Sequence, residues 1–117
     1  MEQALGTVTI HPSVLTTVAR LTSLAMTGVA RMSDEWRLDV ERILGRPGRG
    51  DGVNLSIKDN AVTVDLYVVA EPEANLLRLG HQLQQEVSRA IQDMVGMEVL
   101  AVNVYIQDVD FPFTRGY

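Results

Sequence analysis

The side chains best suited to chemistry in this chain are two histidines. His11 and His81 are the only histidines among 117 residues, and the sequence contains no cysteine. A zinc-binding helix places two ligands four residues apart, whereas His81 stands among glutamines without such a partner. His11 precedes a proline at the predicted start of a helix, which favours a capping or surface role. The sequence therefore predicts no metal site.

Two close pairs of carboxylates are the remaining candidates for acid–base catalysis. Glu71 and Glu73 form one pair, and Asp108 and Asp110 form the other. They flank a predicted helix start and a predicted strand end, where carboxylates more often serve capping and solubility. No G-x-S-x-G nucleophile motif occurs, and the glycine-rich stretch 45–52 lacks the G-K-[ST] ending of a phosphate-binding loop. We therefore expect no catalytic residues and no cofactor, and hence no enzyme.

Five arginines fall between Arg31 and Arg49. Acidic residues are interleaved with the first three of them, which is typical of a salt-bridged helix face. The other interpretation is a basic patch made of Arg42, Arg46 and Arg49, since a cation near an anionic lipid surface gains about 1 kcal/mol. We favour the salt-bridged face and keep the patch as an alternative.

Composition is typical of one globular domain, with 46% hydrophobic and 21% charged residues. We expect a single domain over 1–117, with its core at about 6–109 and a tail at 110–117. The net charge of −5 argues against a general attraction for nucleic acids. No apolar run approaches the ~20 residues of a membrane span, and no basic region opens a signal peptide. These features favour a cytoplasmic protein.

The first half of the chain predicts a strand and two helices. Alternating residues at 7–10 indicate a short strand, and Pro12 suits the first turn of a helix. A second helix is expected to begin at Ser33 and to end at Gly45, before the glycine-rich loop 45–52. The apolar stripe of the first helix is predicted at Val14, Val18, Leu21 and Ala25.

The second half predicts a hairpin, a long helix and a last strand. Apolar residues alternate over 53–69, and Asp59-Asn60 makes the turn. A helix follows at 73–95, and strand alternation resumes at 100–107. The inward positions of the helix are Leu76, Leu79, Leu83, Val87, Ile91 and Met94, and those of the last strand are Leu100, Val102, Val104 and Ile106. The predicted fold is α+β, a two-layer sandwich with helices on one face of a small three- to four-stranded mixed sheet.

The other face of this sheet is predicted to be open and polar. It would carry Val69 and the following polar side chains: Thr63, Asp65, Tyr67, Asn103, Tyr105 and Gln107, with Thr7 and Thr9 if the first strand joins the sheet. Such a face is either plain solvated sheet or a contact surface, since tyrosine is enriched at interfaces. Under the second interpretation the partner-binding residues are Asp65, Tyr67, Asn103 and Tyr105.

Several segments resemble the alkaline shock protein family of bacterial envelope-stress proteins. They are Gly6–Ile10, Thr27–Val29, the hairpin from Gly52 to Val69, Met94–Val99 and Val102–Val109, which together cover about residues 6–109. Two features depart from the family. The segment Glu71–Asn75 lacks the usual glycine turn, and the loop 45–52 is variable among members.

The resemblance implies a non-enzymatic cytoplasmic protein linked to the cell envelope and general stress, with no catalytic residues to carry over. Some members are held at the membrane by a separate anchor protein, and small relatives occur beside a fatty-acid kinase-like protein. The expected partner is therefore a protein, either membrane-anchored or kinase-like, with homo-oligomers as a further form. Membrane contact would be indirect, at the inner face of the cell membrane.

Two functional hypotheses follow. The first is an interaction or scaffold module that binds a partner, or a second copy of itself, through the open face. The alternative is a nucleic-acid-binding module in which Tyr67 and Tyr105 stack under bases. The acidic balance of the chain favours the first.

Overall fold

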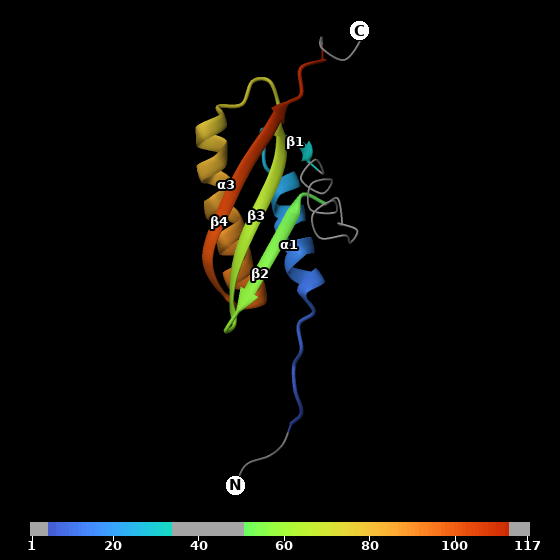
Figure 1. Ribbon diagram of the computed structural model, residues 1–117, viewed down its shortest axis with the longest axis vertical. Helices are drawn as coiled ribbons and strands as arrows, with labels where there is room; N and C mark the ends of the chain where they lie inside the picture. Colours follow the sequence, from blue (N-terminus) through green and yellow to red (C-terminus); the bar gives the residue numbers. More distant parts are fainter. Residues whose placement is uncertain (1–4, 34–50, 113–117) are drawn as a thin grey trace, which may run out of the picture.

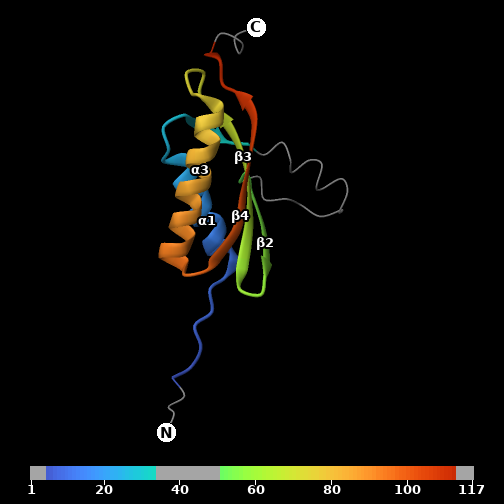
Figure 2. The same ribbon diagram turned by 90° about the vertical axis from the view of Figure 1, so that its left-hand side faces the viewer.

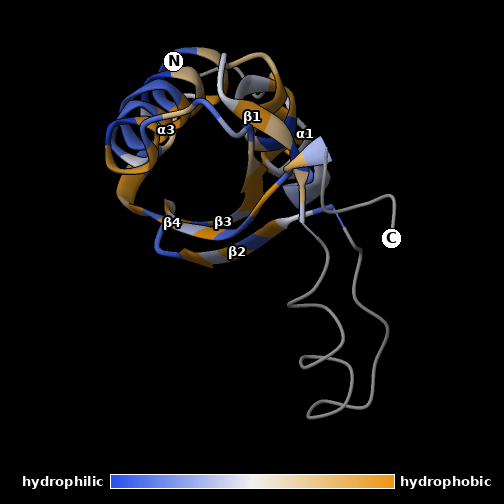
Figure 3. Cartoon of the chain, turned by 90° about the horizontal axis from the view of Figure 1, so that it is seen from above, coloured by the Kyte–Doolittle hydropathy of each residue, from blue (hydrophilic) through white to orange (hydrophobic). Residues whose placement is uncertain are grey.

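The computed structural model describes residues 5–33 and 51–112, which form two layers (Figure 1). One layer holds helix α1 (Pro12–Leu24) and helix α3 (Leu76–Ala90), which continues as the π-helical turn η1 (Ile91–Val95). The other layer is a sheet of four strands: β1 (Val29–Met32), β2 (Val53–Lys58), β3 (Ala61–Ala70) and β4 (Glu98–Val109). Both helices cover the same face of the sheet (Figures 2 and 3). The predicted α+β sandwich is confirmed.

Strand β3 organises the sheet. It pairs antiparallel with β1 and β2 along one edge and parallel with β4 along the other, so the sheet is mixed as predicted. The β2–β3 turn uses Asp59 and Asn60 with φ of 53° and 67°, a conformation these two residue types tolerate better than most. The parallel β3–β4 pair requires a crossover, and α3 supplies it.

The core lies between the sheet and the helices. Alternation on β3 turns Val62, Val64, Leu66 and Val68 toward the helices, and none of these side chains is exposed. The helical layer contributes a set of buried apolar residues to the same core: Leu15, Val18, Ala19, Leu79, Leu83, Val87 and Ile91. This packing stabilises both layers and leaves the opposite face of the sheet without a helix among the described residues.

The predicted strand at 7–10 is wrong. This segment has no strand pairing and extends away from the two layers, with Val8 92% exposed (Figure 1). The position beside β3 that it might have filled belongs to β1, where Val29 pairs with Ala70 and Met32 with Val68. The sequence did not predict β1, because its residues (Val29–Met32) do not alternate between apolar and polar and a bulge lies between Val29 and Arg31.

The predicted stripe on α1 is only partly right. Leu15, Val18 and Ala19 are buried, whereas Val14 and Leu21 are largely exposed. The buried side continues through Ser23, whose hydroxyl donates to the carbonyl of Ala19 at 2.8 Å. Because that bond satisfies the hydroxyl, a polar residue can lie on the inner face, and an apolar pattern does not reveal it.

The long helix begins later than predicted and ends in a different geometry. Asn75 caps it by accepting from the amide of Arg78 at 3.0 Å. At the other end, the Gly96 amide donates to the carbonyl of Ile91, five residues earlier. This π-type turn adds one residue to the last turn. Met94, predicted to face inward, is therefore 73% exposed. 

One residue of β4 also departs from the prediction. Val62 pairs with Val99 and Thr63 with Ala101, so the register skips Leu100. A bulge of this kind shifts the alternation by one residue. Leu100, predicted to be buried, is 59% exposed, while Val102 remains buried as predicted.

Some predictions fall outside the described residues. They include the body of the second helix, most of the glycine-rich loop, and the basic patch Arg42, Arg46 and Arg49. Over the described part of the chain, no helix has both the length and the apolar character needed to cross a membrane.

Candidate functional site

The most ordered feature of the open sheet face is a pair of stacked tyrosines. Tyr67 on β3 and Tyr105 on β4 occupy paired positions in the parallel ladder. Their ring centroids lie 4.8 Å apart and their planes differ by 11°. That separation equals the spacing of neighbouring strands, so the rings face one another across the ladder instead of lying flat on the sheet. Tyr105 is 45% exposed, and Tyr67 is half-buried.

The backbone of Tyr67 fixes the position of this stack. Its amide donates to the carbonyl of Gly52 at 2.8 Å, and its carbonyl accepts from the amide of Ser33 at 2.7 Å. Tyr67 therefore lies where the edge of β3 passes from β2 to β1. Two segments distant in sequence therefore hold the backbone of Tyr67 in place.

Asp65 is the charged centre of the face. Its Oδ1 accepts from Asn103 Nδ2 on β4 at 2.9 Å, and its Oδ2 accepts from Asn54 Nδ2 on β2 at 3.3 Å. The register explains this, because both asparagines are the direct partners of Asp65 on the neighbouring strands. Two amides thus orient one carboxylate, while their own carbonyl oxygens remain as acceptors for a ligand. The structure brings together all four predicted partner-binding residues.

The environment of Tyr67 alters its acidity. Burial raises the pKa of the phenol, and the negative charge of Asp65 and the neighbouring Tyr105 raise it further. The ring therefore stays neutral over a wider range of pH than an exposed tyrosine. The oriented carboxylate beside this neutral phenol provides acceptors to a docking surface.

The far end of the face differs from the prediction. Val69 is buried rather than exposed, after a bulge in the ladder between Val68 and Val69. Nearby, the hydroxyl of Ser33 donates to the side-chain oxygen of Gln107. Thr7 and Thr9 do not join the face, because their segment is not part of the sheet. The open face is thus centred on the tyrosine stack and Asp65.

The two histidines lie in the helical layer, apart from this face. His11 caps α1, where its Nδ1 accepts from the Ser13 amide at 3.1 Å, as predicted. His81 is exposed on α3 and bonds with Gln84. Asp108 accepts from the amide that follows it in the chain. Within residues 5–33 and 51–112, no three His, Asp or Glu side chains gather as metal ligands.

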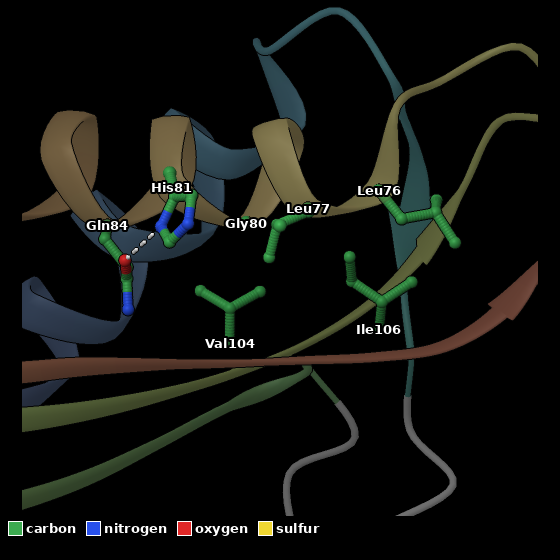
Figure 4. A pocket seen from close by; sticks show the side chains of 7 residues that line it. All are labelled: Leu76, Leu77, Gly80, His81, Gln84, Val104 and Ile106. Atoms are coloured by element: carbon green, nitrogen blue, oxygen red, sulfur yellow. Dashed lines mark hydrogen bonds between the residues drawn. The ribbon is translucent and has the colours of Figure 1, made fainter.

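A second surface, which the sequence did not predict, is an apolar groove between α3 and β4. The groove has a volume of about 340 Å³ and is open to solvent. The side chains of α3 and β4 face each other across it (Figure 4). Its lining consists of Leu76, Leu77, Gly80, His81, Gln84, Val104 and Ile106. Two residues in the sequence could have indicated the groove. Leu77 is a leucine outside the predicted inner stripe of α3, and Gly80 has no side chain to fill the space next to it.

Comparison with known proteins decides the family. The alkaline shock protein 23 family, described as having a cell envelope-related function, matches the chain over residues 1–111. The chain belongs to this family. The resemblance seen in the sequence is therefore confirmed, and the envelope-related description applies to the family as a whole.

Three similar proteins are described as uncharacterized. YqhY of Bacillus subtilis (strain 168) is 24% identical over 107 residues, which are 92% of this chain and 79% of that protein. Spy1535 of Streptococcus pyogenes serotype M6 is 24% identical over 90% of this chain and 80% of its own length. YloU of B. subtilis is 22% identical, with 89% and 88% covered. No solved structure matches the chain.

Proposed function

We propose that this member of the alkaline shock protein 23 family is a non-enzymatic cytoplasmic module that binds a protein partner at the cell envelope through its open sheet face. The observation that carries the proposal is the preorganised centre of that face. There the Tyr67–Tyr105 stack and the carboxylate of Asp65 are held in fixed positions before any partner arrives. Preorganised side chains lose little conformational entropy on binding, which raises affinity for a given contact area.

The composition of the face also suits a protein partner. Tyrosines supply large contact areas and are enriched at interface centres, while the polar groups around them supply hydrogen bonds at the rim. A carboxylate at the centre favours a partner that carries a lysine or arginine there. Such a partner at the membrane would place this protein peripherally, at the inner face of the membrane, without direct lipid contact.

The alternative, nucleic-acid binding, has weaker support. A stacking platform needs aromatic rings whose faces are open to bases. Here one face of Tyr67 and one face of Tyr105 are already turned toward each other. Asp65 adds a negative charge next to them, which repels phosphate. The geometry thus favours a protein surface over a base-stacking surface.

Site-specific photo-crosslinking in bacterial cells tests the proposal. A photoreactive residue replaces Asn103 on the face, and in a control it replaces Gln85, an exposed amide side chain on α3. We expect a protein adduct from position 103, found in the membrane fraction, and several-fold less from position 85. Adding Tyr105→Ser should reduce the adduct at position 103 at least fivefold, which corresponds to about 1 kcal/mol.

Three results would contradict the proposal. Equal adduct yields from positions 103 and 85 would show that the partner does not bind preferentially at the open face. An adduct insensitive to Tyr105→Ser would remove the tyrosine stack from the interface. A nucleic-acid adduct at position 103 would favour the alternative function.

A further inference from the structure

The segment before α1 has the composition of a strand and the position of a free arm. Residues 5–10 read LGTVTI, with four consecutive β-branched residues that are alternately polar and apolar, and with no charge. Every one of these residues is exposed, including Leu5 and Val8 almost completely. The arm leads away from the end of the two layers where α1 begins (Figures 1 and 2). An extended apolar segment that pairs with no strand among the described residues has unused capacity to form a ladder.

The outer edge of β4 provides a place for such a ladder. Among the described strands β4 pairs only with β3, so its other edge has no strand beside it. The carbonyl of Val102 points to this outer edge, because it accepts from the side chain of Gln84 at 3.1 Å. Backbone groups alternate along a strand, so the N–H and C=O of Val104 and Ile106 point to the same edge. Gln84 thus occupies one end of the edge and leaves the next residues open to pairing.

The apolar groove lies at this same stretch of the edge. Side chains of Val104 and Ile106 form its floor on β4, and Leu76 and Leu77 form its wall on α3 (Figure 4). No Asp, Glu, Lys or Arg lines it. A strand added along β4 would direct alternate side chains into the groove. Uncharged, β-branched side chains such as Val8 and Ile10 match it in chemistry and in spacing.

We propose that the arm of one copy, residues 5–10, adds as a strand to the outer edge of β4 in a second copy and inserts Val8 into the groove against Leu77. Strand addition of this kind combines main-chain hydrogen bonds with pockets for alternate side chains. It also covers an edge that would otherwise invite unspecific pairing. This contact is separate from the tyrosine face and does not depend on the proposed function.

The geometry points to a second copy and not to the arm's own chain. Helix α1, from which the arm leaves, lies on the side of the sheet away from β4, and the arm extends beyond the end of the layers opposite to the start of α3 (Figure 1). To reach its own groove it would have to reverse at His11–Pro12 and pass around α3. A second copy can approach the arm directly.

Disulfide trapping tests the contact, because the chain has no cysteine of its own. Purified Val8→Cys protein is mixed under mild oxidation with Leu77→Cys protein that carries a size tag at its C-terminus. The control mixture replaces the second protein with tagged Leu21→Cys, since Leu21 is also a largely exposed leucine on a helix. We expect the Val8–Leu77 heterodimer in at least fivefold higher yield than the Val8–Leu21 heterodimer.

Sedimentation of the cysteine-free protein gives an independent measurement. We expect association beyond the monomer, and Val8→Asp should raise the concentration of half-association at least tenfold because it places a charge in the groove. Leu21→Asp should leave that concentration unchanged. Val8 is exposed in the single chain, so its substitution does not disturb the core.

The outcomes separate clearly. Equal disulfide yields in the two mixtures overturn the proposal, as does a protein that stays monomeric up to about 1 mM. A double variant with Val8→Cys and Leu77→Cys on one chain that forms only an internal disulfide shows that the arm binds its own groove, and this also overturns it. Loss of photo-crosslinking at Asn103 with intact Val8–Leu77 trapping would contradict only the proposed function.

Discussion

Substitution of Gly52 by alanine should be among the most destabilising single-methyl changes in this protein. Gly52 directly precedes β2 and has a φ of +76°, in the left-handed region that L side chains rarely adopt. A Cβ added there would lie 2.7 Å from the carbonyl oxygen of Tyr67 and 2.8 Å from Cβ of Met32. Both neighbours are held in the sheet, so neither can yield as the end of a flexible side chain would.

The expected loss of stability in Gly52→Ala has two parts. The left-handed conformation costs an alanine about 1–2 kcal/mol relative to glycine. Forcing a methyl group into a filled space costs a further 1–3 kcal/mol or so. The backbone of Tyr67 cannot readily move to relieve this strain, because its carbonyl accepts from the Ser33 amide and its amide donates to the carbonyl of Gly52 itself. We therefore expect Gly52→Ala to lower the free energy of unfolding by about 2–5 kcal/mol, a large part of the 5–15 kcal/mol typical of a domain.

Two other glycines separate the parts of this cost. Gly96 has a φ of +81°, but an added Cβ would meet nothing within 4 Å, so Gly96→Ala should show the conformational part alone, about 1–2 kcal/mol. Gly80 lies within α3 with the same open surroundings and no positive φ. Gly80→Ala should stabilise the protein by about 0.5–1 kcal/mol through helix propensity.

Urea unfolding of the three variants and the parent protein gives the comparison, with the midpoint and the slope m measured for each. The expected order of stability is Gly80→Ala, parent, Gly96→Ala, Gly52→Ala. If Gly52→Ala lowers the free energy of unfolding no more than Gly96→Ala does, then Gly52 does not lie as close to Tyr67 and Met32 as the structure places it. The junction of β1, β2 and β3 under the tyrosine stack would then be looser than described.

Three further predictions concern single groups. Because burial, Asp65 and Tyr105 raise the pKa of Tyr67 in the folded state, its contribution to stability should be complete below about pH 10 and should be lost as the pH rises above that value. Asp65→Asn should lower the pKa of Tyr67, as ultraviolet titration of the phenol would show; an unchanged titration would exclude Asp65 as a cause. Gln84→Ala should lower the free energy of unfolding by about 0.5–1 kcal/mol, since it removes the bond to Val102, and a neutral result in urea would mean that water replaces it fully. His11→Ala should cost about 1 kcal/mol through loss of the α1 cap, and thermal unfolding without a shift in Tm would contradict that role.

The sequence predicted the parts of the fold in which a period runs without interruption. The alternation of β3 and the Asp59-Asn60 turn place Asp65 and Tyr67 on the face away from the core, and the structure agrees. Alternation on β4 likewise places Asn103 and Tyr105 on that face. These are local properties, because side-chain direction in a strand has a period of two whatever the strand pairs with.

The sequence failed where one extra residue interrupts a period. The π-type turn at the end of α3 turns Met94 outward, and the bulge in β4 does the same to Leu100. Each insertion depends on how two elements fit together, and no characteristic residue pattern marks it in the sequence. A period that is correct on one side of such a point gives the wrong face for the residue at the point itself, as it does for Met94 and Leu100.

What the sequence by itself determined is which residues can share a face, since that follows from the chain's own periodicity. Only the tertiary structure decided which strands lie beside β3. It gave the position beside β3 to β1 and left the residues 5–10, equally strand-like in sequence, outside the sheet. It also placed Asn54 and Asn103 on either side of Asp65 and stacked the two tyrosines. The physical reason is that pairing and register depend on contacts between distant segments, which compete for the same edges and the same core.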